Sequence, residues 1–401
     1  MTRVAYLVSH PIQYQAPLLR RLAQEKGLDI DVLFLTDFSA RPYRDRGFGR
    51  SITWDVDLLE GYRSRVLRAW GPRDGVGFWT PFTIDVEREL GRGGYDAIWL
   101  HGYAHQTHLR AVLAAKRLGM KVLLRGESHA ATSRLSGVTR LLKDKLLSRL
   151  FTHVDAFLAI GTANRDHYLS LGVPAEKIFL MPYAVDNARF QAAATADRGS
   201  DIRASLGLSP SRPAILCASK LQARKRVWDL WAAYEKLSAN GVAEPTPYLV
   251  FVGDGEHRAD LEAAVARRGW RSVRFAGFQN QTRMPGYYAA SDVFVLCSER
   301  EPWALAVNEA MNAGKPVIVT DQVGAAKDLV GDGDNGYVVP VGDVDALSDR
   351  LRRITSDELL ARRMGASSLR RISRWDFEAD VAGLWQALLG CGVREGALAT
   401  A

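Results

Sequence analysis

The sequence predicts an α/β protein made of two doubly wound parallel sheets. Short apolar runs recur along the chain and are separated by segments in which apolar residues return every three or four positions. This alternation is typical of repeated β-α-β units. With 401 residues the chain is too long for one ordinary domain and suits two. Its 47% hydrophobic and 24% charged residues are ordinary for a globular protein.

The first domain is expected over residues 1–190. Its strands are predicted at residues 4–8, 30–35, 97–100, 121–124, 155–160 and 178–181, and its helices at 17–25 and 106–118. Residues 36–81 are irregular and rich in glycine, arginine and aromatic side chains, so no element is predicted there. The small, polar stretch from residue 187 to 201 is either a linker or a short leading helix.

A second domain of the same kind is expected over residues 191–374. Its strands are predicted at residues 214–217, 248–252, 273–275, 292–296 and 316–320, and its helices at 227–238, 258–268 and from about 305 to Gly314. A final segment, residues 375–401, begins a helix at Trp375 that runs to about Leu389.

The net charge and the cysteines limit the class of protein. A formal charge of +8 favours anionic partners such as nucleotide phosphates or acidic lipids, and no nucleic-acid motif accompanies the basic residues. The 3 cysteines lack metal-type spacing and predict buried thiols in a reducing compartment. No apolar run reaches the roughly 20 residues of a membrane span, and residues 1–8 are typical of a strand rather than a signal peptide. A cytoplasmic protein is therefore expected.

The stretch from Ser298 to Pro316 carries the strongest chemical signal. It lies between two predicted strands, so its loop is expected at the carboxyl edge of a parallel sheet, where ligands bind. Glu301 is in this loop and Glu309 is further on in the helix, a stagger of roughly 10 Å along the axis at 1.5 Å per residue. Such carboxylates suit an elongated polyhydroxylated ligand, and the helix N-terminus between them favours phosphate. The alternative is a pair of solvated helix glutamates.

This stretch also carries a family resemblance. Glu301-Pro302-Trp303, followed by Asn308-Glu309-Ala310 and the exit Gly314-Lys315-Pro316, resembles the signature of the family 4 retaining glycosyltransferases (group 1 glycosyl transferases) of bacterial polysaccharide assembly. The resemblance covers nearly the whole chain and implies the GT-B fold. In that fold two Rossmann-like domains face each other across a cleft, and the C-terminal helix crosses back to the first domain. The first domain would bind the acceptor and the second the nucleotide sugar.

The resemblance also assigns roles to these residues. Glu301 would contact hydroxyl groups of the donor sugar, and Glu309 would contact the ribose of the nucleotide. The residues that follow Glu301 would complete this part of the donor site: Pro302, Trp303, Ala304 and Leu305.

A basic loop follows the first strand of the second domain: Ser219-Lys220-Leu221-Gln222-Ala223-Arg224-Lys225-Arg226. It resembles the family's Gly-Arg-Leu…Glu-Lys-Gly segment, whose basic pair holds the donor pyrophosphate. Lys225 matches the family's lysine, whereas Lys220 stands where arginine is usual and offers a point charge instead of a bidentate fork. Cations here would stabilise the negative charge that the leaving group gains as the anomeric bond breaks. The alternative is a solvated basic loop.

Two further strand ends carry glycine turns. In the resembling family these loops line the nucleotide, so the resemblance assigns four of their residues to the donor site: Gly253, Asp254, Gly277 and Phe278. Turn geometry alone is the alternative explanation.

The first strand ends at His10-Pro11-Ile12-Gln13-Tyr14, where the family usually has a glycine-rich turn. A similar opening occurs in some polysaccharide-assembly members. His10, Gln13 and Tyr14 are therefore candidates for acceptor binding, with turn formation and helix capping as the alternative.

Two more strand ends carry candidates of the first domain. His101 ends one strand and is a further acceptor-binding candidate. Glu127 follows another strand, in the register where the family carries a histidine close to the reacting carbon, and is a catalytic candidate. His129 follows two residues later, so the sequence leaves the choice open between Glu127, His101 and His129.

Metal binding is not expected. Other glycosyltransferases bind a divalent ion through Asp-x-Asp, which occurs here at Asp29-Ile30-Asp31, Asp55-Val56-Asp57 and Asp343-Val344-Asp345. The first borders a strand and the third is expected to cap a helix. Because lysines at the phosphates would make a metal unnecessary, neither a metal nor another cofactor is predicted.

Residues 134–151 predict a basic amphipathic helix. Its apolar positions are Leu135, Val138, Leu141, Leu142, Leu146 and Leu150, and its basic ones Arg134, Arg140, Lys143, Lys145 and Arg149. The helix either packs on the domain with a solvated basic face or docks on the anionic inner face of a membrane, where lipid-linked acceptors are found.

The implied function is transfer of a hexosyl group from a nucleotide-diphosphate sugar to a hydroxyl group of a glycan or lipid-linked saccharide, with retained anomeric configuration. No side chain is an obvious nucleophile, so front-face attack assisted by the leaving phosphate is implied. A nucleotide-sugar epimerase of the same fold and a non-catalytic donor-binding protein are the alternatives. The Glu-Pro-Trp signature argues against the first, and intact Glu301, Glu309 and Lys225 argue against the second. A dehydrogenase is not expected, because no Gly-x-Gly-x-x-Gly follows the first strand.

Overall fold

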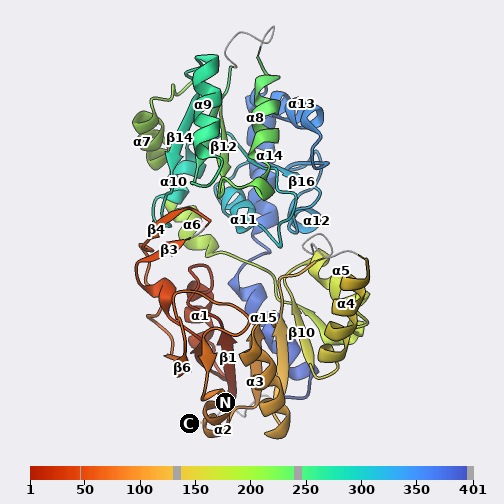
Figure 1. Cartoon of the computed structure of the whole chain (residues 1–401). Helices are drawn as coiled ribbons and strands as arrows, with labels where there is room; N and C mark the ends of the chain where they lie inside the picture. The colour runs from red at the N-terminus through yellow and green to blue at the C-terminus, as the bar shows by residue number, and fades with distance from the viewer. Residues whose placement is uncertain (46, 130–136, 239–245, 395–401) are drawn as a thin grey trace. The chain divides into compact units, whose positions relative to one another are not determined.

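The computed structural model describes residues 1–45, 47–129, 137–238 and 246–394, and the chain divides into two compact units (Figure 1). Unit 1 consists of Met1–Tyr43, Ile52–Tyr183 and Phe377–Ala401, and unit 2 of Arg44–Ser51 and Ala184–Asp376. Each unit has its own parallel sheet, so the predicted α/β class with two Rossmann-like units is confirmed. The units change after Tyr183 and after Asp376, whereas the sequence placed the boundaries after residues 190 and 374. The assignment of Arg44–Ser51 to unit 2 was not anticipated.

Unit 1 is built on a seven-stranded sheet in the order β11-β10-β9-β8-β1-β2-β5, in which every described pairing is parallel. Its strands are β1 (Thr2–Val8), β2 (Leu28–Phe34), β5 (Ser64–Val66), β8 (Ala97–His101), β9 (Lys121–Arg125), β10 (Ala156–Ala159) and β11 (Ile178–Leu180). Every residue of β8 and β10 is buried. This burial explains their continuous apolar sequence, because helices cover both faces of the sheet.

Two core clusters occupy the two faces of this sheet. Helices α2, α3, α4 and α5 contribute to the cluster that contains Ala5 and Leu7, whereas α1 and α15 contribute to the one that contains Val4, Tyr6 and Val8. The alternation follows from the pleat of β1, which points successive side chains to opposite faces. The helices are α1 (Ala16–Ala23), α2 (Val86–Gly93), α3 (Gln106–Arg117), α4 (Gly137–Phe151), α5 (Thr162–Ser170) and α15 (Phe377–Gly390).

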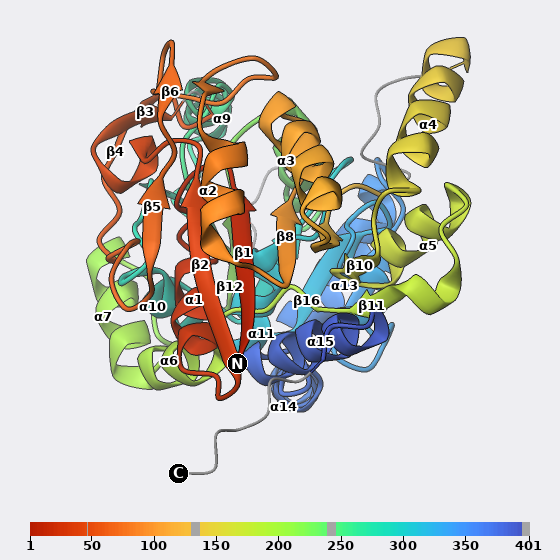
Figure 2. The ribbon, with the colours of Figure 1, turned by 90° about the horizontal axis from the view of Figure 1, so that it is seen from below.

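The C-terminal helix α15 packs on unit 1, as predicted, beside β10 and β11 (Figure 2). Gly383 makes the close approach possible, because a Cβ atom there would lie 2.1 Å from the carbonyl oxygen of Leu180. At the start of the helix, Glu378 accepts hydrogen bonds of 2.6 and 2.7 Å from the guanidinium group of Arg21.

The irregular region after β2 contains short elements that the sequence pattern did not reveal. These are the 3₁₀ helix η1 (Phe38–Ala40), the two-stranded sheet of β3 (Tyr43–Asp45) and β4 (Arg50–Ile52), and the antiparallel pair β6 (Ala69–Trp70) and β7 (Phe82–Thr83). Strands of two or three residues are too short to show the alternation on which the sequence argument depends.

Unit 2 has a six-stranded sheet in the order β14-β13-β12-β15-β16-β17, also with parallel pairings. Its strands are β12 (Ala214–Ala218), β13 (Tyr248–Val252), β14 (Val273–Gly277), β15 (Val293–Leu296), β16 (Val317–Thr320) and β17 (Gly336–Val339). The sheet changes direction between β12 and β15, the kind of switch point beside which α/β proteins bind ligands.

The helices of unit 2 cover this sheet, and α8, α9, α13 and α14 all contribute to its main core. The stretch from residue 187, interpreted as a linker or a leading helix, forms two helices, α6 and α7. The helices are α6 (Asn187–Ala193), α7 (Ala196–Leu206), η4 (Ala223–Lys225), α8 (Val227–Glu235), α9 (Arg258–Arg268), α10 (Met284–Ala289), α11 (Leu305–Asn312), α12 (Ala326–Leu329), α13 (Val344–Thr355) and α14 (Glu358–Ile372). None of the helices in the described ranges is long and apolar enough to cross a bilayer.

Candidate active site

The loops at the carboxyl ends of the unit 2 strands are joined by main-chain hydrogen bonds. The amide of Leu221, after β12, donates to the carbonyl of Asp254, after β13, at 2.9 Å. The amide of Glu299, after β15, donates to the carbonyl of Arg224 at 2.9 Å. The basic loop, the first glycine turn and the signature loop, identified separately in the sequence, therefore form one continuous surface.

Glycine allows two pairs of strand-end loops in unit 2 to approach each other closely. A Cβ atom at Gly253 would lie 2.0 Å from the carbonyl oxygen of Ser219, and one at Gly324 would lie 2.0 Å from that of Pro302. A larger residue at either position would separate the loops. For Gly253, which the family resemblance assigns to the donor site, the structure thus supplies a packing reason for glycine.

Glu301 lies at the centre of this surface. Its Oε2 atom accepts hydrogen bonds from Lys225 Nζ, from Arg224 Nη1 at 3.2 Å and from Ser298 Oγ at 3.2 Å. The side chains of Glu301 and Lys225 are only 12% and 10% exposed. Two of the sequence candidates are thus in direct contact, and Arg224 and Ser298 join them. Arg224 could have been found from its place beside Lys225 in the basic loop.

The charge of the Lys225 ammonium group is costly in this buried position. Burial lowers the pKa of its ammonium group, although the carboxylate of Glu301 opposes this effect. A buried ammonium is stable only beside an anion. An anionic ligand at this position would therefore gain a strong electrostatic interaction in a region of reduced solvent screening.

Glu309 lies on α11, as predicted, in a different environment. Burial raises the pKa of its carboxyl group to about 7, and the hydroxyl group of Tyr288, which donates to Oε2 at 2.7 Å, opposes the shift only in part. Glu309 is therefore half ionised near neutral pH, and its ability to accept hydrogen bonds from a ligand changes there.

The residues between the two glutamates shape the start of α11. The indole of Trp303 is buried, donates Nε1–H to Asn308 Oδ1 at 2.9 Å and stacks on Trp375 with ring centroids 5.1 Å apart. The indole is thus engaged in packing within unit 2, and the donor-binding role expected for this residue stays a prediction. Ala304 caps the helix with a φ of 88°, a conformation that non-glycine residues rarely adopt. Pro302 is half-buried in the loop, and Leu305 is the first residue of α11.

The remaining donor candidates are also neighbours. Asp254 accepts hydrogen bonds from Arg258 and, at 3.0 Å, from the backbone N–H of Phe278, which follows Gly277 at the end of β14. Burial would raise the pKa of Asp254, but these hydrogen bonds lower it below its ordinary value. Lys220 Nζ lies 2.8 Å from Oδ1 of Asp45, a residue from the N-terminal part of the chain that the sequence gave no reason to expect here.

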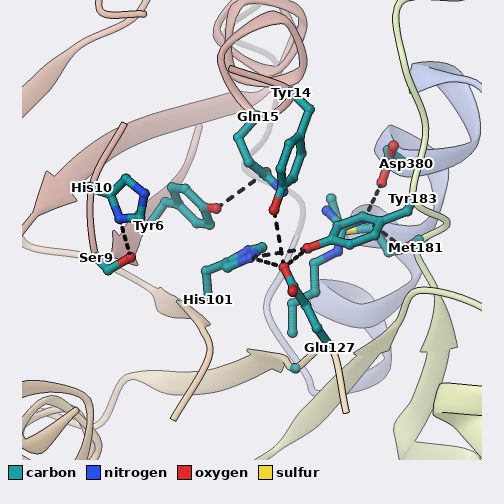
Figure 3. A network of polar contacts seen from close by, with 12 residues as sticks. Tyr6, Ser9, His10, Tyr14, Gln15, His101, Glu127, Met181, Tyr183 and Asp380 are labelled. Carbon is teal, nitrogen blue, oxygen red and sulfur yellow. Dashed lines mark hydrogen bonds and ion pairs between the residues drawn. The ribbon is translucent and has the colours of Figure 1, made fainter. Parts of the chain in front are cut away.

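A second constellation occupies the carboxyl ends of the unit 1 strands (Figure 3). The Oε1 atom of Glu127 accepts hydrogen bonds from the hydroxyl groups of Tyr183 and, at 3.2 Å, Tyr14, and lies 3.2 Å from His101 Nε2. Among the described residues, no hydrogen bond reaches the other carboxylate oxygen, and the side chain is 38% exposed. Burial would raise the pKa of Glu127, but His101 and the two tyrosines lower it to about 2. The carboxylate is therefore ionised.

A buried arginine lies behind this cluster. Arg125 is fully buried, and its Nη2 donates to the carbonyls of Met181 and Pro182 at 3.0 and 2.9 Å and to Asp380 of α15 at 3.1 Å. Its guanidinium lies 4.5 Å from the ring centroid of Tyr183. The sequence did not identify Tyr183, although its position just after β11 follows the same strand-end rule as Glu127.

The other candidates of unit 1 lie at or near this cluster. His10 Nδ1 is 2.9 Å from Ser9 Oγ, and its ring packs 4.7 Å from that of Phe38. Burial, with a contribution from His101, lowers the pKa of His10 to about 4. Gln13 is half-buried between β1 and α1, and His129 is buried in the loop after β9. Glu127 thus contacts two of the other candidates, His101 and Tyr14.

The Asp-x-Asp pairs have other partners. Asp29 and Asp31 form ion pairs with Arg3 and Arg63, Asp57 accepts backbone hydrogen bonds at 2.8 and 2.9 Å, and Asp343 caps α13 as predicted. Within the described ranges, no three His, Cys, Asp or Glu side chains come together as a metal site.

The basic helix begins within the predicted range and is α4; residues 134–136 of the prediction lie outside the described residues. Leu147 and Phe151 anchor its C-terminal half in the core. By contrast, Val138, Leu141, Leu142 and Leu146 are each between 62% and 71% exposed. A packed helix that buries all its apolar positions is therefore excluded for this part. In Figure 2, the start of α4 extends outward beyond α5.

Two family models match the chain. Residues 12–184 match the model described as "Glycosyl transferase 4-like domain", and residues 200–371 match "Glycosyl transferases group 1". The matches confirm the family resemblance drawn from the signature residues.

Curated relatives have related descriptions. Alpha-D-kanosaminyltransferase of Streptomyces kanamyceticus is 29% identical over 197 residues, which are 49% of this chain and 50% of that protein. The chain thus spans about half the length of this relative. The GDP-mannose-dependent monoacylated alpha-(1-6)-phosphatidylinositol monomannoside mannosyltransferase of Corynebacterium glutamicum is 28% identical over 309 residues, covering 75% of this chain and 78% of the relative.

Solved structures share the fold. The Anabaena protein HepE in complex with UDP superposes with a TM-score of 0.73 and 18% identity, over 97% of this chain and 100% of the other. A glycosyltransferase of Rickettsia africae superposes with a TM-score of 0.74 and 14% identity, over 98% and 99% of the two chains. At these identities the likeness establishes the fold, which is GT-B.

Proposed function

Since this chain belongs to the group 1 glycosyltransferases of family 4, we propose that it moves a hexosyl group from a nucleotide-diphosphate sugar to a hydroxyl group of a saccharide acceptor, with retained anomeric configuration. The names of two similar proteins support the donor class, since one is GDP-mannose-dependent and the other was solved with UDP. In polysaccharide assembly the acceptor is a glycan or a lipid-linked saccharide.

The observation that carries this proposal is the contact of Glu301 with Lys225 and Arg224 at the carboxyl edge of the unit 2 sheet. A sugar diphosphate needs both chemistries in one place. Its hydroxyl groups need a carboxylate that accepts hydrogen bonds, and its diphosphate needs fixed cations as negative charge develops on it.

Each residue then has a role in the reaction. Glu301 orients the sugar, Glu309 accepts hydrogen bonds from the ribose, and Lys220 and Lys225 hold the diphosphate. In unit 1, Glu127 accepts a hydrogen bond from the acceptor hydroxyl group through its Oε2 atom. Because the cations carry the charge of the leaving group, the reaction needs no metal, and excess EDTA leaves turnover unchanged; a loss of turnover restored by Mg²⁺ would contradict this.

A donor panel followed by a variant tests the proposal. Nucleoside diphosphates and their sugars are screened by thermal shift, because a specific ligand stabilises the fold by mass action. Transfer and donor hydrolysis are then measured for the wild type and for Glu301→Ala, and the anomer of the product is read by NMR. Stabilisation by no donor, or full turnover by Glu301→Ala, would refute the proposal. Conversion of the donor to another sugar without an acceptor would identify an epimerase.

We also propose that the protein docks on an anionic membrane surface through α4. At 3.6 residues per turn, the exposed apolar residues Val138, Leu142 and Leu146 share one side of the helix with the exposed cations Lys145 and Arg149. This mixture of aliphatic and basic side chains suits the headgroup region of an acidic bilayer. A saccharide acceptor linked to lipid would be found there.

Vesicle sedimentation tests the docking surface. The protein should bind phosphatidylglycerol vesicles and bind phosphatidylcholine vesicles much less. A Leu142→Asp/Leu146→Asp double variant should lose the binding, whereas Leu359→Asp should retain it, because Leu359 is 78% exposed on α14 of unit 2. Undiminished binding of the double variant would exclude α4 as the docking site.

A further inference from the structure

Three residues from the N-terminal part of the chain contact the proposed donor site within unit 2. Asp45 binds Lys220 through both carboxylate oxygens, with Nζ–O distances of 2.8 and 3.0 Å. Phe48 packs edge-on against Phe278, with ring centroids 4.9 Å apart. Arg50 donates from Nη1 to Asp254 Oδ2 at 3.1 Å.

Their targets come from three different strand-end loops. Lys220 follows β12, Asp254 follows β13 and Phe278 follows β14, and each is a donor-binding candidate from the sequence. One short stretch of chain therefore occupies the places that a nucleotide diphosphate would need, with an acidic group on the lysine and an aromatic ring beside Phe278.

The contact between Asp45 and Lys220 is geometrically defined. Asp45 Oδ1 also accepts the backbone N–H groups of Gly47 at 2.7 Å and Phe48 at 3.0 Å, which hold the carboxylate in place. Lys220 Nζ also lies 4.6 Å from the ring centroid of Phe48. An ammonium group has three N–H donors and no acceptor, and a carboxylate that takes two of them leaves little for a phosphate.

The electrostatics agree with a specific pair. The side chains of Lys220 and Asp45 are 30% and 16% exposed. Burial would raise the pKa of Asp45, but Lys220 and the backbone N–H groups lower it below its ordinary value. Asp45 is thus an anion at neutral pH, like the diphosphate for which Lys220 is proposed.

We propose that Asp45 is an internal competitor of the donor, which holds Lys220 until a diphosphate replaces it. This inference rests on the proposed function and adds a control of donor affinity to it. Donor binding breaks the contact between Asp45 and Lys220 and moves the ammonium group to a phosphate oxygen. The carboxylate of Asp45 thereby lowers the affinity for every diphosphate, whatever its base.

Calorimetry on the full chain tests this inference with inorganic pyrophosphate, UDP, GDP and ADP as probes. Asp45→Asn removes the charge and keeps the Oδ1 atom that accepts from Gly47 and Phe48, so the turn is preserved. We expect Asp45→Asn to bind pyrophosphate and the preferred nucleoside diphosphate about tenfold more tightly than the wild type, which equals about 1.4 kcal/mol.

Asp37→Asn is the matched control. Asp37 also forms an ion pair, at 2.6 Å with Arg41, but lies in unit 1 and contacts no donor candidate in the described part of the chain. Its removal should leave all affinities unchanged. Circular dichroism of both variants checks that they are folded, and Asp45→Ser supplies a second neutral variant should Asp45→Asn unfold.

The possible outcomes separate this inference from the proposed function. Tighter binding by Asp45→Asn, with unchanged Asp37→Asn, supports it. Equal affinity overturns the inference and leaves the proposed function intact. Weaker binding also overturns it, because Asp45 would then help to form the site. If wild type and variants bind none of the probes, the proposed donor site itself is refuted, and the inference falls with it.

Discussion

Unit 1 and unit 2 each place a glutamate at the carboxyl edge of their sheet, but the partners of the two carboxylates differ. Glu301 is bound by the cations Lys225 and Arg224. Glu127 is bound by the neutral hydroxyl groups of Tyr14 and Tyr183 and by His101. In the first environment two cationic side chains contact one carboxylate, whereas in the second two hydroxyl groups and an imidazole contact one carboxylate oxygen.

This difference suits the opposite chemistries proposed for the two units. A surplus of fixed cations stabilises a ligand that becomes more negative, as a departing nucleoside diphosphate does. A carboxylate supported by hydroxyl groups accepts hydrogen bonds from a neutral sugar. The predictions below test whether the two glutamates are as different in function as they are in environment.

The largest effect is expected from Glu301→Gln. Loss of the charge weakens the acceptor proposed for sugar hydroxyl groups and leaves Lys225 without its anion, so turnover should fall about 10²–10³-fold, as for other preorganised electrostatic groups. Steady-state assays measure this effect. Glu299→Gln is the matched control, because Glu299 is in the same loop and pairs with Arg226 and Arg300 instead. Equal losses in the two variants would deny Glu301 a specific role.

Glu127→Gln should affect the acceptor alone. A hydrogen bond to a charged group contributes about 1.5–3 kcal/mol, so kcat/KM for the acceptor should fall roughly 10–100-fold. The Kd of the nucleoside diphosphate, measured by calorimetry, should not change. A weaker diphosphate affinity in this variant would remove the distinction between the two glutamates.

Glu309 should make donor binding depend on pH. Its carboxyl group, with a pKa of about 7, would accept the proposed ribose hydrogen bonds much more strongly when ionised. Affinity for the diphosphate should therefore fall about tenfold from pH 8 to pH 6. In Glu309→Gln this pH dependence should disappear, and only the pH dependence caused by protonation of the diphosphate itself should remain. The variant therefore serves as the control. Glu127, with a pKa of about 2, contributes no change in this range. A variant with the wild-type pH profile would contradict the assignment.

The same pKa values predict opposite effects on stability. The raised pKa of Glu309 means that the folded state keeps a proton that the unfolded state releases, so the free energy of unfolding should decrease as pH rises from about 4.5 through 7. The lowered pKa of Glu127 contributes stability above about pH 4.5, and this contribution is lost as pH falls toward 2. Urea unfolding of Glu309→Gln and Glu127→Gln across this range measures both slopes. Parallel slopes in the two variants would contradict the opposite pKa shifts of Glu309 and Glu127.

The smallest effect is expected from the tyrosines that hold Glu127. Tyr183→Phe removes a hydroxyl group that donates to a carboxylate in a buried position, so the free energy of unfolding should fall by about 1.5 kcal/mol. Tyr14→Phe should cost less, because Tyr14 is only half-buried. Urea denaturation measures both losses. A larger loss in Tyr14→Phe would show that Tyr14, and not Tyr183, contributes more to holding Glu127 in place.

Local sequence determined the frame of the molecule. Apolar runs such as those of β8 and β12, with glycine at helix ends, located most of the buried parallel strands, although β5, β17 and the helices α2 and α5 were not predicted. The rule that parallel strands expose their ends at one edge, together with the family resemblance, then identified Glu301, Glu309, Lys225 and Glu127, because neither needs knowledge of distant contacts.

Only the tertiary structure decided which of these side chains act together. Lys225 and Glu301 are 76 positions apart, Tyr183 and Glu127 are 56 apart, and Asp45 and Lys220 are 175 apart. The exposure of Leu141 and Leu142 on α4 depends equally on what the rest of unit 1 leaves uncovered. Local periodicity carries no information about such pairs, because folding of the whole chain brings the strand ends together and selects the partners that each charge finds.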